Sequence, residues 1–137
     1  MNDTDQYFDS AHVDPHDSDA TWFDLNAGVP SLELAPNLGS RPVIGQNLAI
    51  SYINFAPNTR APVHSHSEEQ IVLVLEGQVE FEVNGVAGLL GPGMGIVIPP
   101  NVPHGARTYD SPCVEIDVFH PPRQALVERL RELTTNH

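Results

Sequence analysis

The sequence predicts an all-β fold, and its composition and periodicity both support that class. The chain has 137 residues, which fits one domain with a core of its own. It contains 13 prolines and 10 glycines, which suit many short strands joined by turns better than a helical bundle. From residue 47 onward, apolar or alternating segments recur at intervals of roughly ten residues, the spacing typical of a β-sandwich or β-barrel.

The predicted strands follow one another along the second half of the chain. Residues 47–56, 78–83 and 114–119 alternate apolar and polar side chains, as half-buried strands do, and a continuous apolar run follows Gln70 in the segment 70–77. Asn84 and Gly85 form a strong signal for a two-residue hairpin turn. The strand signals lie at residues 47–56, 70–77, 78–83, 86–90, 94–100, 101–106 and 114–119.

The C-terminal segment has a different period. Within residues 123–134, Leu126, Val127, Leu130 and Leu133 recur at helical spacing, with charged residues largely on the opposite side. This pattern predicts one amphipathic helix that closes the fold.

The N-terminal segment is acidic and lacks apolar periodicity. Residues 1–24 hold seven aspartates and no lysine or arginine, and the whole chain has a formal net charge of −12. We therefore expect residues 1–20 to form an acidic, disordered tail ahead of a domain at 21–137. The bulky residues of TWFDL (21–25) predict a segment packed on the domain or on a second subunit.

The charge and cysteine content exclude several classes of partner. An acidic protein repels phosphate backbones and anionic lipid, so we expect no nucleic-acid or membrane partner. Its single cysteine, Cys113, allows no internal disulfide, and no apolar run has the length of a membrane span. The acidic, polar start of the chain is unlike a secretory signal, which predicts a cytoplasmic protein.

Four neutral side chains could bind a metal ion. His64 and His66 are two residues apart, so on a strand they would project to the same face, and Gln70 keeps the same parity. Glu69 has the opposite parity and is expected to point away. His104 lies in IPPNVPHGA, where neighbouring prolines fix the direction of the backbone.

The order of these residues resembles the two sequence motifs of the cupin superfamily. The first half reads H-x-H-x3-Q-x6-G, and the second reads G-x5-P-x4-H from Gly93 to His104, so the resemblance covers roughly residues 45–120. It implies a small jelly-roll β-barrel that binds one divalent metal ion, whether Zn, Ni, Fe, Mn or Co. Asn58 and Asn101 stand where the motifs usually have glycine, and asparagine tolerates the positive φ of such turns. The ligands implied by the resemblance are His64, His66, Gln70 and His104.

The glutamine in the first motif favours non-redox chemistry. Many cupins have a glutamate where this chain has Gln70, and three imidazoles with one amide leave the charge of a divalent ion uncompensated. Such an ion is a stronger Lewis acid and is less suited to stabilising a higher oxidation state.

A more specific resemblance is to the pectin-degradation cupins, which convert 4,5-unsaturated monouronates into linear keto sugars. That family carries a D-x-F-x3-R element after the second motif, and this chain has Asp117, Phe119 and Arg123 at that spacing. The resemblance implies an isomerase or lyase in which Asp117 moves a proton and Arg123 holds a substrate carboxylate. Glu115 shares the strand parity of Asp117, and a solvent-facing role fits its pattern as well as a functional one.

Three other functions fit the same residues. They are an iron-dependent dioxygenase, a cyclase or isomerase of secondary metabolism, and a non-catalytic module that binds a small ligand; the fold alone does not choose among them. Each requires a small-molecule partner. A homodimer is also expected, because exposed strand edges and the aromatic TWFDL segment need covering.

Overall fold

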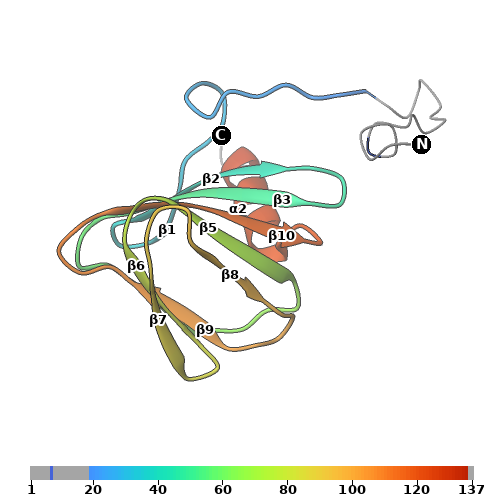
Figure 1. Cartoon of the computed structure of the whole chain (residues 1–137). Helices are drawn as coiled ribbons and strands as arrows, with labels where there is room; N and C mark the ends of the chain where they lie inside the picture. The colour runs from blue at the N-terminus through green and yellow to red at the C-terminus, as the bar shows by residue number, and fades with distance from the viewer. Residues whose placement is uncertain (1–6, 8–18, 136–137) are drawn as a thin grey trace.

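Two antiparallel sheets and one C-terminal helix make up the part of the chain described by the computed structural model, which is residue 7 and residues 19–135 (Figure 1). The six-stranded sheet has the order β1-β2-β3-β10-β5-β8, and the four-stranded sheet has the order β4-β9-β6-β7. The elements are β1 (Leu32–Ala35), β2 (Leu38–Ile44), β3 (Ala49–Phe55), β4 (Arg60–His64), β5 (Glu69–Gly77), β6 (Val79–Val83), β7 (Val86–Leu90), β8 (Gly95–Ile98), β9 (His104–Arg107), β10 (Cys113–His120) and α2 (Gln124–Thr135). The predicted all-β jelly-roll class is confirmed.

The core lies between the inner faces of the two sheets. Along β3 and β10 every second side chain is buried, which is the alternation expected of strands with one face on a core. Ile53 and Val72 from the large sheet pack in one cluster with Phe81 and Ala106 from the small sheet. The inward positions of the central strand β10 therefore face the interior between the sheets.

The turns between the strands use asparagine and glycine as the sequence predicts. Asn84 and Gly85 both have positive φ, of 51° and 82°, which is the backbone of a type I′ turn between β6 and β7. Asn58 and Asn101 also have positive φ, of 54° and 67°. The expectation that these asparagines replace glycine in left-handed turns is confirmed.

The strands β1, β2 and β4 are not among the predicted strand segments, and one predicted strand is too long. Gly39 and Pro42 interrupt the apolar pattern of β2, although the strand pairs with β3 along its whole length, and β1 has only four residues. The strand predicted at 101–106 begins at His104, since residues 101–103 form a turn.

The helix matches its prediction within one residue at each end. Leu126 is buried against Leu32 and Phe119, with Leu130 and Leu133 packed beside them. A cis peptide bond at His120–Pro121 lies between β10 and α2. The helix therefore packs beside the end of β10 that carries Phe119.

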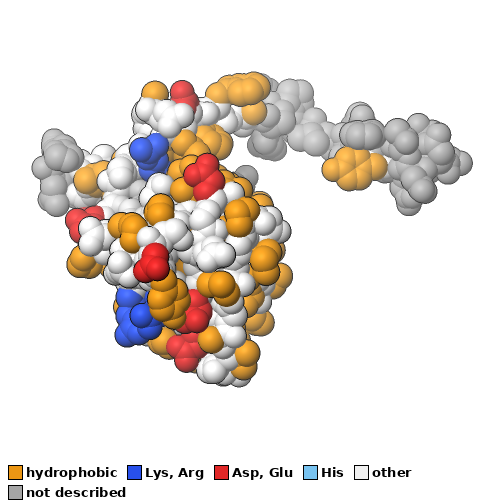
Figure 2. Space-filling model, turned by 60° about the vertical axis from the view of Figure 1, so that its left-hand side comes forward, with side chains coloured by type: hydrophobic (Ala, Val, Ile, Leu, Met, Phe, Trp, Pro, Cys, Tyr) orange, Lys and Arg blue, Asp and Glu red, His pale blue; other side chains and the backbone are white. Residues whose placement is uncertain are grey.

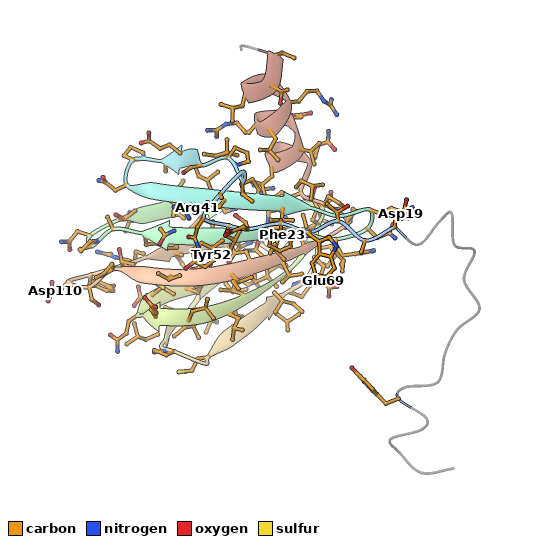
Figure 3. The ribbon with its side chains drawn as sticks, turned by 90° about the horizontal axis from the view of Figure 1, so that it is seen from above. Asp19, Phe23, Arg41, Tyr52, Glu69 and Asp110 are labelled. Atoms are coloured by element: carbon orange, nitrogen blue, oxygen red, sulfur yellow. The ribbon has the colours of Figure 1, made fainter. Side chains whose placement is uncertain are left out.

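The predicted tail at 1–20 lies outside the described residues, apart from residues 7, 19 and 20. The next segment is attached to β2, because the Arg41 guanidinium donates to the carbonyl of Leu25 at 3.2 Å (Figure 3). Trp22 and Phe23 are nevertheless 93% and 54% exposed. The segment thus contacts its own domain through the Leu25 backbone, while the Trp22 and Phe23 rings stay exposed.

The surface is mixed in character. Hydrophobic side chains are exposed on the face shown in Figure 2, with charged side chains in small groups between them. Among the described residues, no helix has the length and apolar character needed to cross a membrane.

Candidate metal centre

Three histidines converge where strands of the two sheets end. His64 closes β4 and lies directly opposite His104, the first residue of β9, and their ring centroids are 4.4 Å apart. His66 follows in the loop to β5, with its ring 4.8 Å from that of His104. One nitrogen from each ring lies within 4.8 Å of the others. The structure thus brings together all three histidines that the sequence predicts as ligands.

The reason for this convergence differs from the predicted one. The spacing of His64 and His66 predicts that both lie on one strand, but β4 ends at His64. The loop after β4, rather than strand alternation, turns His66 back toward the other two rings. Gln70 joins them from the next strand, β5, so its parity with the histidines does not explain its position.

The imidazoles are held in the tautomer that a metal site needs. The Nδ1 atoms of His64, His66 and His104 lie 2.8, 3.0 and 2.8 Å from backbone carbonyls two residues away. A carbonyl only accepts, so each Nδ1 carries a proton. The Nε2 atoms of His64 and His104 then keep a free lone pair, whereas Nε2 of His66 lies 3.0 Å from the Gln70 amide oxygen. Metal-bound histidines are oriented by the same kind of contact through the other ring nitrogen.

The buried histidines are also held neutral. Burial is the main cause that lowers the pKa of His104 and of His66, and neighbouring positive groups lower both further. Nε2 of His104 is buried and has no hydrogen-bond partner among the described residues. An unsatisfied lone pair aimed at two other imidazoles is the feature that a metal ion would satisfy.

Gln70 presents its oxygen to this cluster. Its Oε1 lies 3.0 Å from Nε2 of His66, while its Nε2 donates to Oδ2 of Asp117 at 3.1 Å. The Asp117 carboxylate therefore fixes which end of the amide faces the histidines. Glu69 is exposed, as its parity predicts (Figure 3).

Two buried carboxyl groups lie next to this centre on β10. Burial raises the pKa of Asp117 to about 6, although hydrogen bonds from neighbouring side chains, Gln70 among them, and the charge of Arg123 oppose that shift. Burial, and then the adjacent Asp117 carboxyl, raise the pKa of Glu115 well above its ordinary value. Oδ1 of Asp117 and Oε1 of Glu115 have no hydrogen-bond partner among the described residues.

Phe119 lies beside His66, and Arg123 lies near Phe119 just before α2. The Phe119 ring packs edge-on against His66 with centroids 5.8 Å apart, and the Arg123 guanidinium lies 6.0 Å from the Phe119 ring. A guanidinium nitrogen of Arg123 is 3.9 Å from Oε1 of Glu68. Burial lowers the pKa of Arg123, but the guanidinium remains cationic at any physiological pH.

Glu68 connects the loop between β4 and β5 to α2. It is 5% exposed, its Oε2 accepts from the backbone N–H of Gln124 at 2.7 Å, and its Oε1 lies 3.4 Å from Nδ1 of His66. No role is predicted for Glu68 from the sequence. Nothing in its local pattern indicates that this loop glutamate accepts a hydrogen bond from the N-terminus of a helix 56 residues away. Glu115 had a signal, its parity with Asp117, but that signal fits a solvent-facing stripe equally well.

A cavity of about 270 Å³ is lined by most of these groups, though not by His66 or Glu68. His64, Gln70 and His104 line one part of it, together with Asp117, Glu115 and Arg123. Apolar side chains form most of the remaining wall, which includes Leu34, Leu38, Ile53, Phe55 and Phe81. Its size fits a small molecule rather than a polymer.

A family model described as a cupin domain matches residues 51–119, which is half of the chain and includes every predicted ligand. The chain belongs to the cupin family. The match begins on β3 and ends at Phe119, so it also covers both buried carboxyl groups of β10.

Two curated cupin relatives are enzymes of different classes. The chain is 35% identical over 72 residues to dimethylsulfoniopropionate lyase DddQ of Ruegeria pomeroyi, and this match covers 52% of the chain and 36% of that protein. It is 37% identical over 71 residues to H2HPP isomerase of Bacillus subtilis, a match that covers 50% of the chain and 29% of the isomerase. The matched region thus spans about a third of the length of these relatives.

Solved cupin structures match over more of their length. KdgF from Halomonas sp. aligns with a TM-score of 0.66 and 25% identity, over 71% of this chain and 92% of that protein. An RmlC-like cupin from Shewanella frigidimarina aligns with a TM-score of 0.71 and 26% identity, over 78% and 96% of the two chains.

Proposed function

We propose that this cupin is a metal-dependent enzyme of the isomerase or lyase type, which moves a proton on a small, oxygenated substrate that carries a carboxylate. The observation that carries the proposal is the contact between Gln70 and Asp117. One amide presents its oxygen to three imidazoles and donates its N–H to the carboxylate beside them. A site for a Lewis acid and a site for a proton-transfer group are therefore adjacent in one cavity.

The donor set fits a divalent first-row metal ion. His64, His66, His104 and Gln70 would hold it, because nitrogens of three imidazoles and one amide oxygen lie close together. When bound, such an ion supplies Lewis-acid stabilisation to a substrate oxygen on which negative charge develops.

Asp117 is proposed as the group that accepts and returns the substrate proton. Its pKa of about 6 lies close to neutral pH, where a general base combines an ionised state with useful basicity. Its Oδ2 is held by Gln70, which leaves Oδ1 free to meet a substrate. Arg123 is proposed to hold the substrate carboxylate, since its planar guanidinium binds a carboxylate through two hydrogen bonds.

A 4,5-unsaturated uronate is the substrate that we propose first. The D-x-F-x3-R element at Asp117, Phe119 and Arg123 supports it, because all three side chains line one cavity beside the candidate ligands. The likeness to KdgF from Halomonas sp., which extends over 92% of that chain, supports it further.

A second candidate substrate is a short carboxylate such as dimethylsulfoniopropionate. The identity to dimethylsulfoniopropionate lyase favours this class. The reaction would use the same groups, with Asp117 removing a proton next to the carboxylate held by Arg123.

Parallel turnover assays separate the candidate functions. Purified holoprotein is incubated with an unsaturated uronate, followed by loss of its ultraviolet absorbance, and with dimethylsulfoniopropionate, followed by NMR. We expect turnover of the uronate and no oxygen consumption after addition of ferrous iron in air. Oxygen uptake coupled to substrate loss would identify a dioxygenase, and binding without turnover would identify a non-catalytic module.

We also propose that two copies associate through the outer face of the six-stranded sheet. Strand register places Tyr52, Ile116 and Leu73 in one row on this face, and Val97 beside them is 58% exposed. Trp22, Phe23, Ile71 and Leu75 are also exposed, and a specific interface buries roughly 800 Å² on each partner.

Sedimentation tests this association. A dimeric wild type and a monomeric Leu73→Glu variant are expected, with Leu89→Glu on β7 as a control that stays dimeric. A Leu73→Glu variant that sediments like the wild type would exclude this face.

A further inference from the structure

Glu115 occupies a place in the cavity that the proposed reaction leaves unused. It precedes Asp117 by two residues on β10, so the two side chains project to the same inner face about 6.5 Å apart along the strand. Glu115 is 1% exposed and lines the same cavity as the candidate metal ligands. The acid is therefore reached from the substrate space and not from the bulk solvent.

The surroundings of Glu115 are apolar. Its cross-strand neighbours are Ile53 on β3 and Val74 on β5, and both are almost fully buried. Oε1 of Glu115 has no hydrogen-bond partner among the described residues. A buried polar atom that lacks a partner costs about 1–3 kcal/mol, and a ligand that supplies the partner recovers that cost.

Burial disfavours the charged form of Glu115. Burial, and then the charge and hydrogen bond of the neighbouring Asp117 carboxyl, raise the pKa of Glu115 well above its ordinary value of 4.5. Two adjacent carboxyl groups with different pKa values can divide their roles, because one ionises while the other keeps its proton. A neutral carboxyl group both donates and accepts hydrogen bonds.

We propose that Glu115 is a substrate-binding residue whose free carboxyl oxygen pairs with a hydroxyl group of the substrate. The inference rests on the proposed function, because it assumes that the substrate lies between Arg123 and Asp117. The hydroxyl group would lie further along β10 than the reacting carbon, on the side of Glu115. Hydroxyl is the group that fits, since it pairs with a carboxyl oxygen whether that oxygen carries the proton or not.

This role of Glu115 favours one substrate class over the other. A sugar acid offers a carboxylate at one end and ring or chain hydroxyl groups at the other, while its carbon skeleton can lie on the apolar wall. Dimethylsulfoniopropionate has no hydroxyl group and would leave Oε1 of Glu115 buried without a partner. Sites built to pair with a substrate hydroxyl reject analogues that lack it.

Binding of a sugar acid that does not react tests the inference apart from turnover. D-galacturonate is titrated by calorimetry into wild-type holoprotein, Glu115→Gln and Glu115→Met. Glutamine keeps a polar pair for the hydroxyl, so we expect its Kd within about threefold of the wild type. Methionine removes the polar atoms at similar size, so we expect a Kd about tenfold weaker.

Several results would overturn the inference. Equal Kd values for the wild type and Glu115→Met would do so, and so would a wild type that does not bind D-galacturonate. If Glu115→Met does not fold, infrared difference spectra of the wild type against Glu115→Gln replace it. The protonated-carboxyl band of Glu115 is expected to shift when D-galacturonate is added, and an unmoved band contradicts the role. Failure of uronate turnover with normal D-galacturonate binding would instead count against the proposed function.

Discussion

Removal of the Glu68 carboxylate is expected to weaken the packing of α2 against the loop between β4 and β5. Oε2 of Glu68 accepts from the N–H of Gln124 at 2.7 Å, at the N-terminus of the helix, and Oε1 is 3.9 Å from the Arg123 guanidinium. A hydrogen bond to a charged group contributes about 1.5–3 kcal/mol, and loss of a helix cap costs about 0.5–2 kcal/mol. Both ranges describe the one contact with Gln124, so they are not added together. Because Glu68 is buried, we expect the upper part of the first range: Glu68→Ala should lower the free energy of unfolding by about 2–3 kcal/mol.

Thermal unfolding measures this effect. For a domain of this size, about 2–3 kcal/mol corresponds to a Tm decrease on the order of 10 °C. Glu69→Ala is the matched control, because the neighbouring side chain is exposed, and its Tm is expected to stay within about 2 °C of the wild type. A Glu68→Ala variant with the Tm of Glu69→Ala would refute the reasoning.

The stabilising effect of the Glu68 carboxylate has a predicted pH dependence. Burial alone would raise the pKa of Glu68, but the Gln124 N–H and other backbone hydrogen bonds, followed by the charges of His66 and Arg123, outweigh it and lower the pKa below 4.5. A lowered carboxyl pKa stabilises the fold above the unfolded value and loses that contribution as the pH falls through the folded value. The Tm difference between wild type and Glu68→Gln is therefore expected to shrink below about pH 4.5.

Three further substitutions have expected outcomes. Asp117→Asn should lower kcat at least about 100-fold with normal metal content, and near-normal kcat would exclude Asp117 as the proton-transfer group. The raised pKa of Glu115 means that the folded wild type loses stability as the pH rises above 4.5. The Tm of Glu115→Gln should therefore rise relative to that of the wild type over this pH range, and a pH-independent Tm difference would contradict this. Gly95→Ala should unfold at a much lower temperature than the control Gly88→Ala, because a Cβ at Gly95 would lie 2.1 Å from the carbonyl oxygen of Val72, whereas Gly88 has open space.

The sequence predicts much of this fold because its local signals agree with one another. Alternation in β3, β6 and β10 and the Asn84–Gly85 turn each specify a local conformation. The strand β2 was not predicted, because Gly39 and Pro42 interrupt its alternating side-chain pattern. Its strand conformation depends on backbone pairing with β3, which a side-chain pattern does not show.

The candidate site could also be predicted only in part from the sequence. His64, His66, Gln70 and His104 were found from their spacing and from the family resemblance, although the loop that aims His66 was taken for a strand. Glu68 is far from Gln124 in sequence, so its contact with α2 depends on tertiary packing that no local pattern contains. The burial of Glu115 likewise follows from which face of β10 meets the core, and that is decided by the neighbouring strands.

The metal content of the purified protein tests the central claim most directly. We expect about one divalent first-row metal ion per chain in the wild type. His104→Ala removes the buried Nε2 that lacks a partner and is expected to lose most of that metal, whereas His120→Ala, an exposed residue on the same strand as Asp117, is expected to keep it. A wild type without bound metal, or a His104→Ala variant with wild-type metal content, would contradict the account.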